Sequence, residues 1–169
     1  MQHNSLQEIN LFGASGHAKV IMDIIEAQGN KVGCLYDDAP KQDKLHGVEV
    51  RHSSEVNAQR PLIISIGLNW HRKSVAERLN LQFAKAIHPT AIISPYAKIG
   101  VGSVVMQGAI IQSDSVIGQH CIVNTGASVG HECKIEDYVH IAPHSTLCGN
   151  VHVGEGTWIG AGTVVIPGV

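Results

Sequence analysis

Two residues of this 169-residue chain have types and a spacing that most clearly point to chemistry. They are His131 and Gly149, which lie 18 positions apart. An imidazole can remove a proton from an attacking group, and the unencumbered N–H of a glycine can donate to an oxyanion. Glu132 adjoins His131 and could orient or polarise its ring. If the fold brings His131 and Gly149 within a few ångströms of each other, they supply what acyl transfer needs.

A second group of residues that could do chemistry is the turn GASG at positions 13–16, which follows the apolar segment EINLF. A helix that begins at His17 would present free N–H groups to an anion, and the glycines of the turn would let a phosphate approach. Asp37 ends the next apolar segment, where an acid can accept hydrogen bonds from a ribose or a base. The same turn also fits a tight strand-to-helix connection that binds nothing.

The elements that must position this turn form a small parallel α/β unit, Rossmann-like, over residues 1–84. Only one mononucleotide-sized half is present, so a nucleotide diphosphate is a better size match than a dinucleotide. Residues 43–56 are polar and are expected to form a loop. The expected strands are Glu8–Phe12, Lys31–Tyr36 and Leu62–Ile66, and the expected helices are His17–Gln28 and about Trp70 to Leu79.

The second half of the chain, residues 85–169, has a strict period of six. Neither the helical period of 3.6 nor plain alternation gives such a repeat, whereas a parallel β-helix does. Three hexapeptides would make one rung of the β-helix, so residues 18 apart should stack at the ~4.8 Å spacing of strands. The large apolar residues of the repeat are Ile87, Ile93, Ile99, Val105, Ile111, Ile117, Val123, Val129, Ile135, Ile141, Leu147, Val153, Ile159 and Val165.

This register puts His131 at a corner of the β-helix, with Gly149 at the same corner one rung further on. It puts His140 on an outward face, where it cannot meet His131 unless neighbouring chains come together. A zinc site from His131, His140 and His144 is a less favoured alternative, because its ligands would have to come from two chains. We expect the remaining histidines of the repeats to be solvated, namely His88, His120, His144 and His152.

The composition argues against nucleic-acid-binding, membrane-spanning and disulfide-bonded secreted proteins. A net charge of −2 gives no electrostatic reason for a nucleic-acid partner. No apolar run approaches the ~20 residues of a membrane span, and the first residues lack a signal-peptide core. The four cysteines form no CxxC pair, so reduced thiols in a cytoplasmic protein are expected.

Four segments together resemble the NeuD/PglD family of hexapeptide-repeat sugar acetyltransferases. They are LFGASGHAKV, YDD at 36–38, SIGLN at 65–69, and the run from NTGASVGHEC through YVHIAP and LCGNVHVGEGTWIGAGTVVIPGV. This family includes bacterial N-acetyltransferases of nucleotide-linked amino sugars and sialic-acid O-acetyltransferases. The resemblance spans nearly the whole chain and implies a left-handed β-helix, an exception to the usual crossover rule.

The resemblance also implies the roles of individual residues in the β-helix. It implies direct acetyl transfer from acetyl-CoA, with His131 taking the proton from a sugar amine and Glu132 supporting it. The N–H of Gly149 and the side chain of His140 would hold the acetyl carbonyl, and Asn124 would support the site. No metal is implied.

In the N-terminal unit the resemblance implies a nucleotide-sugar pocket, and it implies a homotrimer with acetyl-CoA and the active sites between subunits. Val169 falls inside a hexapeptide, so we expect the β-helix to continue past a truncated C-terminus. The residues matching the pocket are Gly13, Ser15, Gly16, His17, Asp37, Asp38, Gly67 and Asn69.

The function that this resemblance implies is N-acetylation of a UDP-linked amino sugar, a 4-amino-4,6-dideoxy hexose, in bacterial glycan or polysaccharide biosynthesis. Two alternatives remain open. A sialic-acid O-acetyltransferase would act on a substrate without UDP, and a non-catalytic scaffold would bind the nucleotide sugar without turnover.

Overall fold

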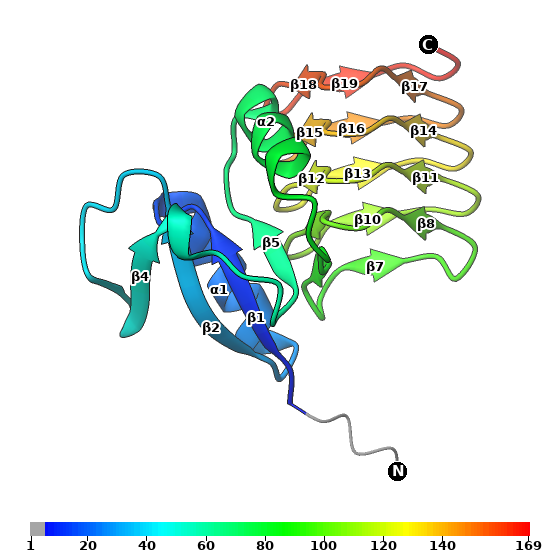
Figure 1. Cartoon of the computed structure of the whole chain (residues 1–169). Coiled ribbons are helices and arrows are strands. Elements are labelled where there is room, and N and C mark those ends of the chain that lie inside the picture. The colour runs from blue at the N-terminus through cyan, green and yellow to red at the C-terminus, as the bar shows by residue number, and fades with distance from the viewer. Residues whose placement is uncertain (1–5) are drawn as a thin grey trace.

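The computed structural model describes residues 6–169, and its first part is a five-stranded sheet with the order β3-β4-β2-β1-β5 (Figure 1). β1 pairs in parallel with both β2 and β5, so the carboxyl ends of these three strands meet at one edge. The elements are β1 (Glu8–Phe12), α1 (Gly16–Ala27), β2 (Lys31–Asp37), β3 (Lys44–Leu45), β4 (Val48–His52), the 3₁₀ helix η1 (Ser53–Glu55), β5 (Leu62–Ile64) and α2 (Asn69–Leu79).

The predicted strands and helices of this part are confirmed, but the loop expected over residues 43–56 was wrong. β3 and β4 form an antiparallel hairpin there, and β4 also pairs in parallel with β2. The two residues between them, His46 and Gly47, both have positive φ, as tight hairpins require. Leu45 and Val50 are buried and anchor the hairpin. The two strands hold only three apolar residues, Leu45, Val48 and Val50, which are too few to show a sustained alternating pattern.

From residue 86 onward the chain forms fourteen two-residue strands, as the period of six predicted. The strands pair in parallel into three sheets, which are the three faces of the β-helix. The register pairs residues 18 apart, for example Ile122 with His140. The large residue of each hexapeptide points inward, and burial of each contributes about 1.5–3 kcal/mol. The strands are β6 (Ala86–Ile87), β7 (Ile92–Ile93), β8 (Lys98–Ile99), β9 (Val104–Val105), β10 (Ile110–Ile111), β11 (Val116–Ile117), β12 (Ile122–Val123), β13 (Ser128–Val129), β14 (Lys134–Ile135), β15 (His140–Ile141), β16 (Thr146–Leu147), β17 (His152–Val153), β18 (Trp158–Ile159) and β19 (Val164–Val165).

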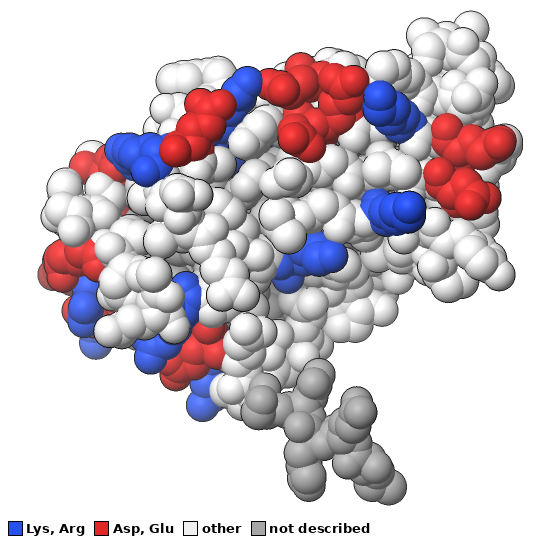
Figure 2. Space-filling model, turned by 45° about the vertical axis from the view of Figure 1, so that its right-hand side comes forward, with Lys and Arg blue, Asp and Glu red and all other residues white. Residues whose placement is uncertain are grey.

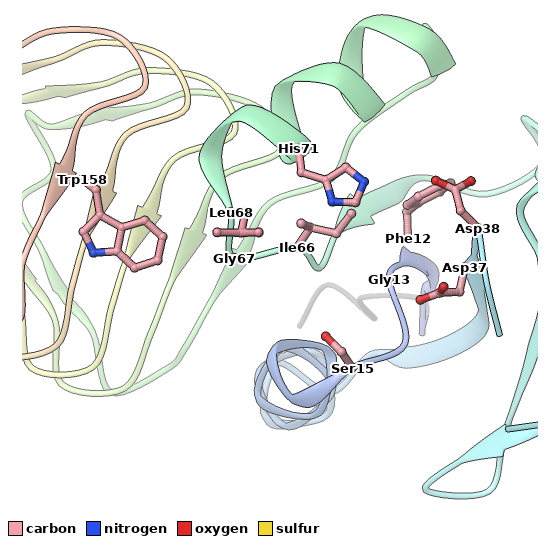
Figure 3. A pocket seen from close by; sticks show the side chains of 10 residues that line it. All are labelled: Phe12, Gly13, Ser15, Asp37, Asp38, Ile66, Gly67, Leu68, His71 and Trp158. Carbon is pink, nitrogen blue, oxygen red and sulfur yellow. The ribbon is translucent and has the colours of Figure 1, made fainter. Parts of the chain in front are cut away.

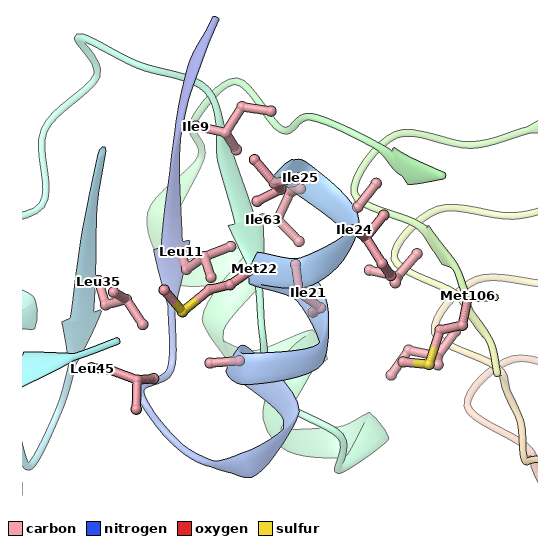
Figure 4. Close-up of a cluster of buried hydrophobic side chains, with 14 of the residues drawn as sticks. Ile9, Leu11, Ile21, Met22, Ile24, Ile25, Leu35, Leu45, Ile63 and Met106 are labelled. Carbon is pink, nitrogen blue, oxygen red and sulfur yellow. The ribbon is translucent and has the colours of Figure 1, made fainter. Parts of the chain in front are cut away.

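The N-terminal part packs against one of the three sheets, β18-β15-β12-β9-β6, and α2 runs beside it (Figure 1). Ile21 and Ile24 of α1 share one buried cluster with Met106 and Ile122 of the β-helix (Figure 4). α1 therefore packs on the sheet of its own domain and on the β-helix, which fixes the two halves relative to each other.

The surface gives two further observations. On the face in Figure 2, acidic and basic side chains are interspersed and no continuous basic surface extends over it. Among residues 6–169, no helix combines the length and the apolar character needed to cross a membrane.

Candidate active site

The structure brings His131 and Gly149 together at the corner between β13 and β14. A Cβ built on Gly149 would lie 2.5 Å from Nε2 of His131 and 2.6 Å from its Cε1. Nδ1 of His131 lies 2.9 Å from a carboxylate oxygen of Glu132. A carboxylate accepts, so Nδ1 carries the proton and Nε2 keeps the lone pair that a general base uses. Glu132 has φ +59, and this left-handed corner turns its carboxylate back toward the ring.

Imidazoles lie over glycines at two other corners of the β-helix, but within the described residues only the His131 corner combines the ring with an available N–H. His144 lies over Gly126, whose N–H donates to the carbonyl of Gln107 at 3.0 Å. The N–H of Gly102, under His120, likewise donates to a backbone carbonyl. Within residues 6–169, no acceptor takes the N–H of Gly149. A base and a free donor therefore meet at one corner, and acyl transfer is the chemistry that uses both.

A pocket of about 380 Å³ lies at the carboxyl ends of β1, β2 and β5, where α/β sheets bind ligands (Figure 3). Gly13 has φ +109 and closely approaches the carbonyl of Ser65, a conformation suited to glycine. Trp158 comes from β18, so both halves of the chain build this pocket. Its lining is Phe12, Gly13, Ser15, Asp37, Asp38, Ile66, Gly67, Leu68, His71 and Trp158.

A neighbouring hollow of about 260 Å³ shares Ser15 and Asp37 with this pocket and also contains Gly16, Lys19 and Lys41. Ser15 precedes α1 without a side-chain cap, so the N–H groups of Gly16 and His17 are available to an anion, whereas that of Ala18 donates to the carbonyl of Ser15. The two lysines add positive charge beside them. This arrangement suits a phosphate group that bridges the two hollows.

The two acids of the pocket already have partners in the chain. The carboxylate of Asp37 accepts the N–H groups of Ala14 and Ala39, both at 2.9 Å, and thereby fastens the glycine turn. Arg78 donates to both oxygens of Asp38, at 3.0 and 3.1 Å. Each carboxylate oxygen has a second lone pair, so both acids can still accept from a ligand.

Two residues matched to the pocket by sequence, Asn69 and His17, line neither of the two hollows. Asn69 is buried and donates from Nδ2 to the carbonyls of Gly156 and Thr157 in the β-helix. His17 lies at the start of α1 with Nε2 buried and without a partner among the described residues. Burial lowers the pKa of His17 to about 4, so its ring is neutral at physiological pH.

His140 faces outward from the β-helix, as expected, but its own chain covers it. Its side chain is 5% exposed and contacts the indole of Trp158, with ring centroids 4.1 Å apart. Asn124 Oδ1 accepts the N–H of Thr125, so its Nδ2 donates to Nε2 of His140 at 3.0 Å. Nδ1 then carries the proton, and it has no partner among the described residues. Burial, with the nearby Arg72 charge, lowers the pKa of His140 to about 4.

The expectation that His120 is solvated was wrong. It is 3% exposed and lies between Phe83 and Tyr138, with its ring parallel to that of Tyr138. The N-terminal half docks on this corner, which periodicity along the chain does not reveal. Arg72 and Trp158 are further residues of the site region that the sequence did not single out. Arg72 lies in the polar helix α2, and Trp158 occupies an ordinary outward position of the repeat.

The pocket and the His131 corner of one chain lie on opposite sides of the β-helix. Trp158 belongs to the sheet that faces the N-terminal half, whereas the His131 corner joins the other two sheets (Figure 1). A molecule bound in the pocket therefore lies on the other side of the β-helix from His131 of the same chain. Within residues 6–169 no group of three or more His, Cys, Asp or Glu side chains could hold a metal ion.

The fold and this corner are those of the hexapeptide-repeat class of acyltransferases, with an α/β unit attached at the N-terminal side. The family model "PglD N-terminal domain" matches residues 8–79, and "Bacterial transferase hexapeptide (six repeats)" matches residues 114–149.

Two solved structures resemble the chain over nearly its whole length. A histidine variant of perosamine N-acetyltransferase from Caulobacter crescentus, in complex with CoA and GDP-perosamine, is 33% identical with a TM-score of 0.89. The match covers 97% of this chain and 82% of that one. The acetyltransferase domain of PglB from Neisseria gonorrhoeae FA1090, in complex with acetyl coenzyme A, is 32% identical with a TM-score of 0.88, covering 96% and 83%. The chain belongs to this family of left-handed β-helix sugar acetyltransferases.

A further relative is "UDP-N-acetylbacillosamine N-acetyltransferase" of Bacillus subtilis (strain 168). It is 40% identical over 114 residues, which cover 60% of this chain and 52% of that protein. The chain thus matches about half the length of the Bacillus protein.

Proposed function

We propose that this chain transfers the acetyl group of acetyl-CoA to the amino group of a UDP-linked amino sugar, a 4-amino-4,6-dideoxy hexose, in bacterial glycan or polysaccharide biosynthesis. The observation that carries the proposal is the free N–H of Gly149 beneath the imidazole that Glu132 orients. The names of the Bacillus and Caulobacter relatives support a nucleotide-linked amino sugar as the acceptor class.

In this reaction Nε2 of His131 takes a proton from the sugar amine as its nitrogen attacks the acetyl carbonyl. The N–H of Gly149 donates to the oxyanion that develops, and Glu132 stabilises the imidazolium. Collapse of the tetrahedral intermediate breaks the C–S bond, and the departing thiolate takes the proton back from His131. No acyl-enzyme forms.

We assign to His140 the role of a second donor toward the acetyl group, contributed by the chain whose pocket holds the acceptor. Asn124 fixes the tautomer that keeps the proton on Nδ1 of His140. The acceptor would occupy the α/β domain, residues 1–84, with its nucleoside toward Asp37 and Asp38 and its diphosphate at the glycine turn. Its sugar would point toward Trp158 and the β-helix, residues 85–169.

The proposed assembly is a homotrimer in the cytoplasm, with each active site between two chains. Its main support is that the pocket and the His131 corner of one chain face opposite ways. The sheet β19-β16-β13-β10-β7 has an uncharged outer face suited to a subunit contact, and Ile92 and Val164 are two-thirds exposed on it. The cysteines are free, which suits a reducing compartment. Light scattering measures the mass of the assembly.

Release of free CoA thiol tests the activity against UDP- and GDP-linked amino sugars and free sialic acid. We expect release only with a nucleotide amino sugar, competitive inhibition by UDP, and a product heavier by one acetyl group in mass spectrometry. Turnover of sialic acid that UDP does not inhibit would favour O-acetylation. Nucleotide-sugar binding without turnover would favour a scaffold.

Replacing Gly149 by alanine should lower kcat about 100-fold. The new methyl group would collide with the His131 ring, and a displacement of about 1 Å in an active site can cost this much. Gly154→Ala is the matched control, because a Cβ there meets nothing within 4 Å. Equal kcat values for the two variants would contradict the role of this corner.

A further inference from the structure

Arg72 is a buried cation whose acceptors are all neutral. Its side chain is 1% exposed, and its guanidinium donates five hydrogen bonds to protein oxygens, which uses its full donor capacity. Buried charges are costly unless they are paired or fully hydrogen-bonded. The bonds run from Nε to His120 O (2.7 Å), from Nη2 to Tyr138 O (2.8 Å) and Asn69 Oδ1 (2.9 Å), and from Nη1 to Ile66 O and Gly67 O (both 3.0 Å).

These acceptors belong to two separate parts of the molecule. Ile66 and Gly67 form one wall of the acceptor pocket. His120 and Tyr138 are the corners of two consecutive rungs of the β-helix, both in the left-handed conformation. A single rigid guanidinium therefore joins the pocket wall to the β-helix, and its planar geometry sets both distance and angle.

Asn69 extends this connection to the opposite wall. Its Oδ1 accepts from Arg72, and its Nδ2 donates to the carbonyls of Gly156 (2.9 Å) and Thr157 (3.1 Å). The next residue is Trp158, which lies beside Leu68 at the end of the pocket away from Asp37 and Asp38 (Figure 3). Both walls at this end are thus held by the same hydrogen-bonded pair, although neither Arg72 nor Asn69 lines the pocket.

We propose that Arg72 and Asn69 are positioning residues that set the separation of the two pocket walls and thereby align the acceptor sugar for transfer. This inference rests on the proposed function, because the sugar end of the pocket is assigned by it. The pair acts through the walls and touches no substrate. Its loss should therefore impair use of the acceptor and spare acetyl-CoA, whose proposed site lies at the opposite corner of the β-helix.

The test compares Asn69→Ala and Arg72→Lys with Lys73→Ala by steady-state kinetics and thermal unfolding. Lys73 pairs with Glu155 across the same boundary but on the surface, so it is a matched control. We expect kcat/KM for the acceptor to fall about 100-fold in the first two variants, with the Kd of CoA within 2-fold of wild type. Lys73→Ala should keep wild-type values.

Asn69→Ala keeps four of the five acceptors of Arg72, so it decides the question even if Arg72→Lys fails to fold. Wild-type kcat/KM in folded Asn69→Ala would overturn the proposal, as would equal losses in acceptor use and CoA binding. If the wild-type protein acetylates no nucleotide sugar, the proposed function fails instead. In that case, calorimetry with the UDP-amino sugar tests the positioning role of Arg72 and Asn69. Binding to Asn69→Ala about 10-fold weaker than to the wild-type protein supports this role, and unchanged binding overturns it.

Discussion

His131→Ala is expected to lower kcat 10²–10⁴-fold, the usual contribution of a general base. The His131 side chain is 60% exposed, so its truncation should leave the fold intact. His144→Ala is the matched control, because this ring also lies over a glycine but the N–H of that glycine is already bonded. A wild-type kcat for His131→Ala, or an equal loss for His144→Ala, would refute the assignment.

Subunit mixing extends this prediction to the assembly. Ser15→Trp should fill the pocket without removing a helix cap, because the Ser15 side chain makes no capping hydrogen bond. His131→Ala and Ser15→Trp should each retain at most about 1% of wild-type activity alone. Mixed oligomers should regain activity, because an intact pocket of one chain can meet an intact His131 of another. Mixed oligomers without activity would place the whole site in one chain.

Acidification from pH 6.5 to pH 4 should destabilise the protein strongly. The pKa values of His17, His120 and His140 are lowered to about 4, mainly by burial and in part by the charge of Arg72, with His140 also contributing to the shift of His17. Asp137 acts in the opposite direction on His120 alone. The unfolded chain, with histidine pKa values near 6.5, binds more protons throughout this window. Stability is therefore complete above pH 6.5 and is lost as the pH falls toward 4.

The size of this effect follows from about 1.4 kcal/mol per pKa unit, or about 3 kcal/mol for one histidine. The three contributions will not add fully, because all three rings interact with Arg72. Urea unfolding at pH 7, 6 and 5 measures the slope. His120→Phe, which keeps an aromatic ring between Phe83 and Tyr138, should flatten it, whereas His46→Asn at an exposed position should not. An unchanged slope in His120→Phe would contradict this origin of the acid sensitivity.

The sequence alone determined the β-helix and the corner at which His131 lies over Gly149. Each rung of a parallel β-helix contacts only the rungs above and below it, so a fixed offset along the chain is also a fixed offset in space. The glycine turn and α1 could also be predicted, because each depends on residue types within one short segment of the sequence. The β3–β4 hairpin was missed because its strands carry too few apolar residues to show a period.

Only the tertiary structure decided which face of the β-helix the N-terminal half covers. That docking buries His120 and His140, makes Trp158 a pocket wall, and uses Asn69 to hold the two halves together rather than to line the pocket. Its contacts join residues far apart, such as Arg72 with His120 and Asn69 with Gly156. No repeat relates such pairs, because they depend on the shapes and polar groups of two surfaces that exist only after each half has folded.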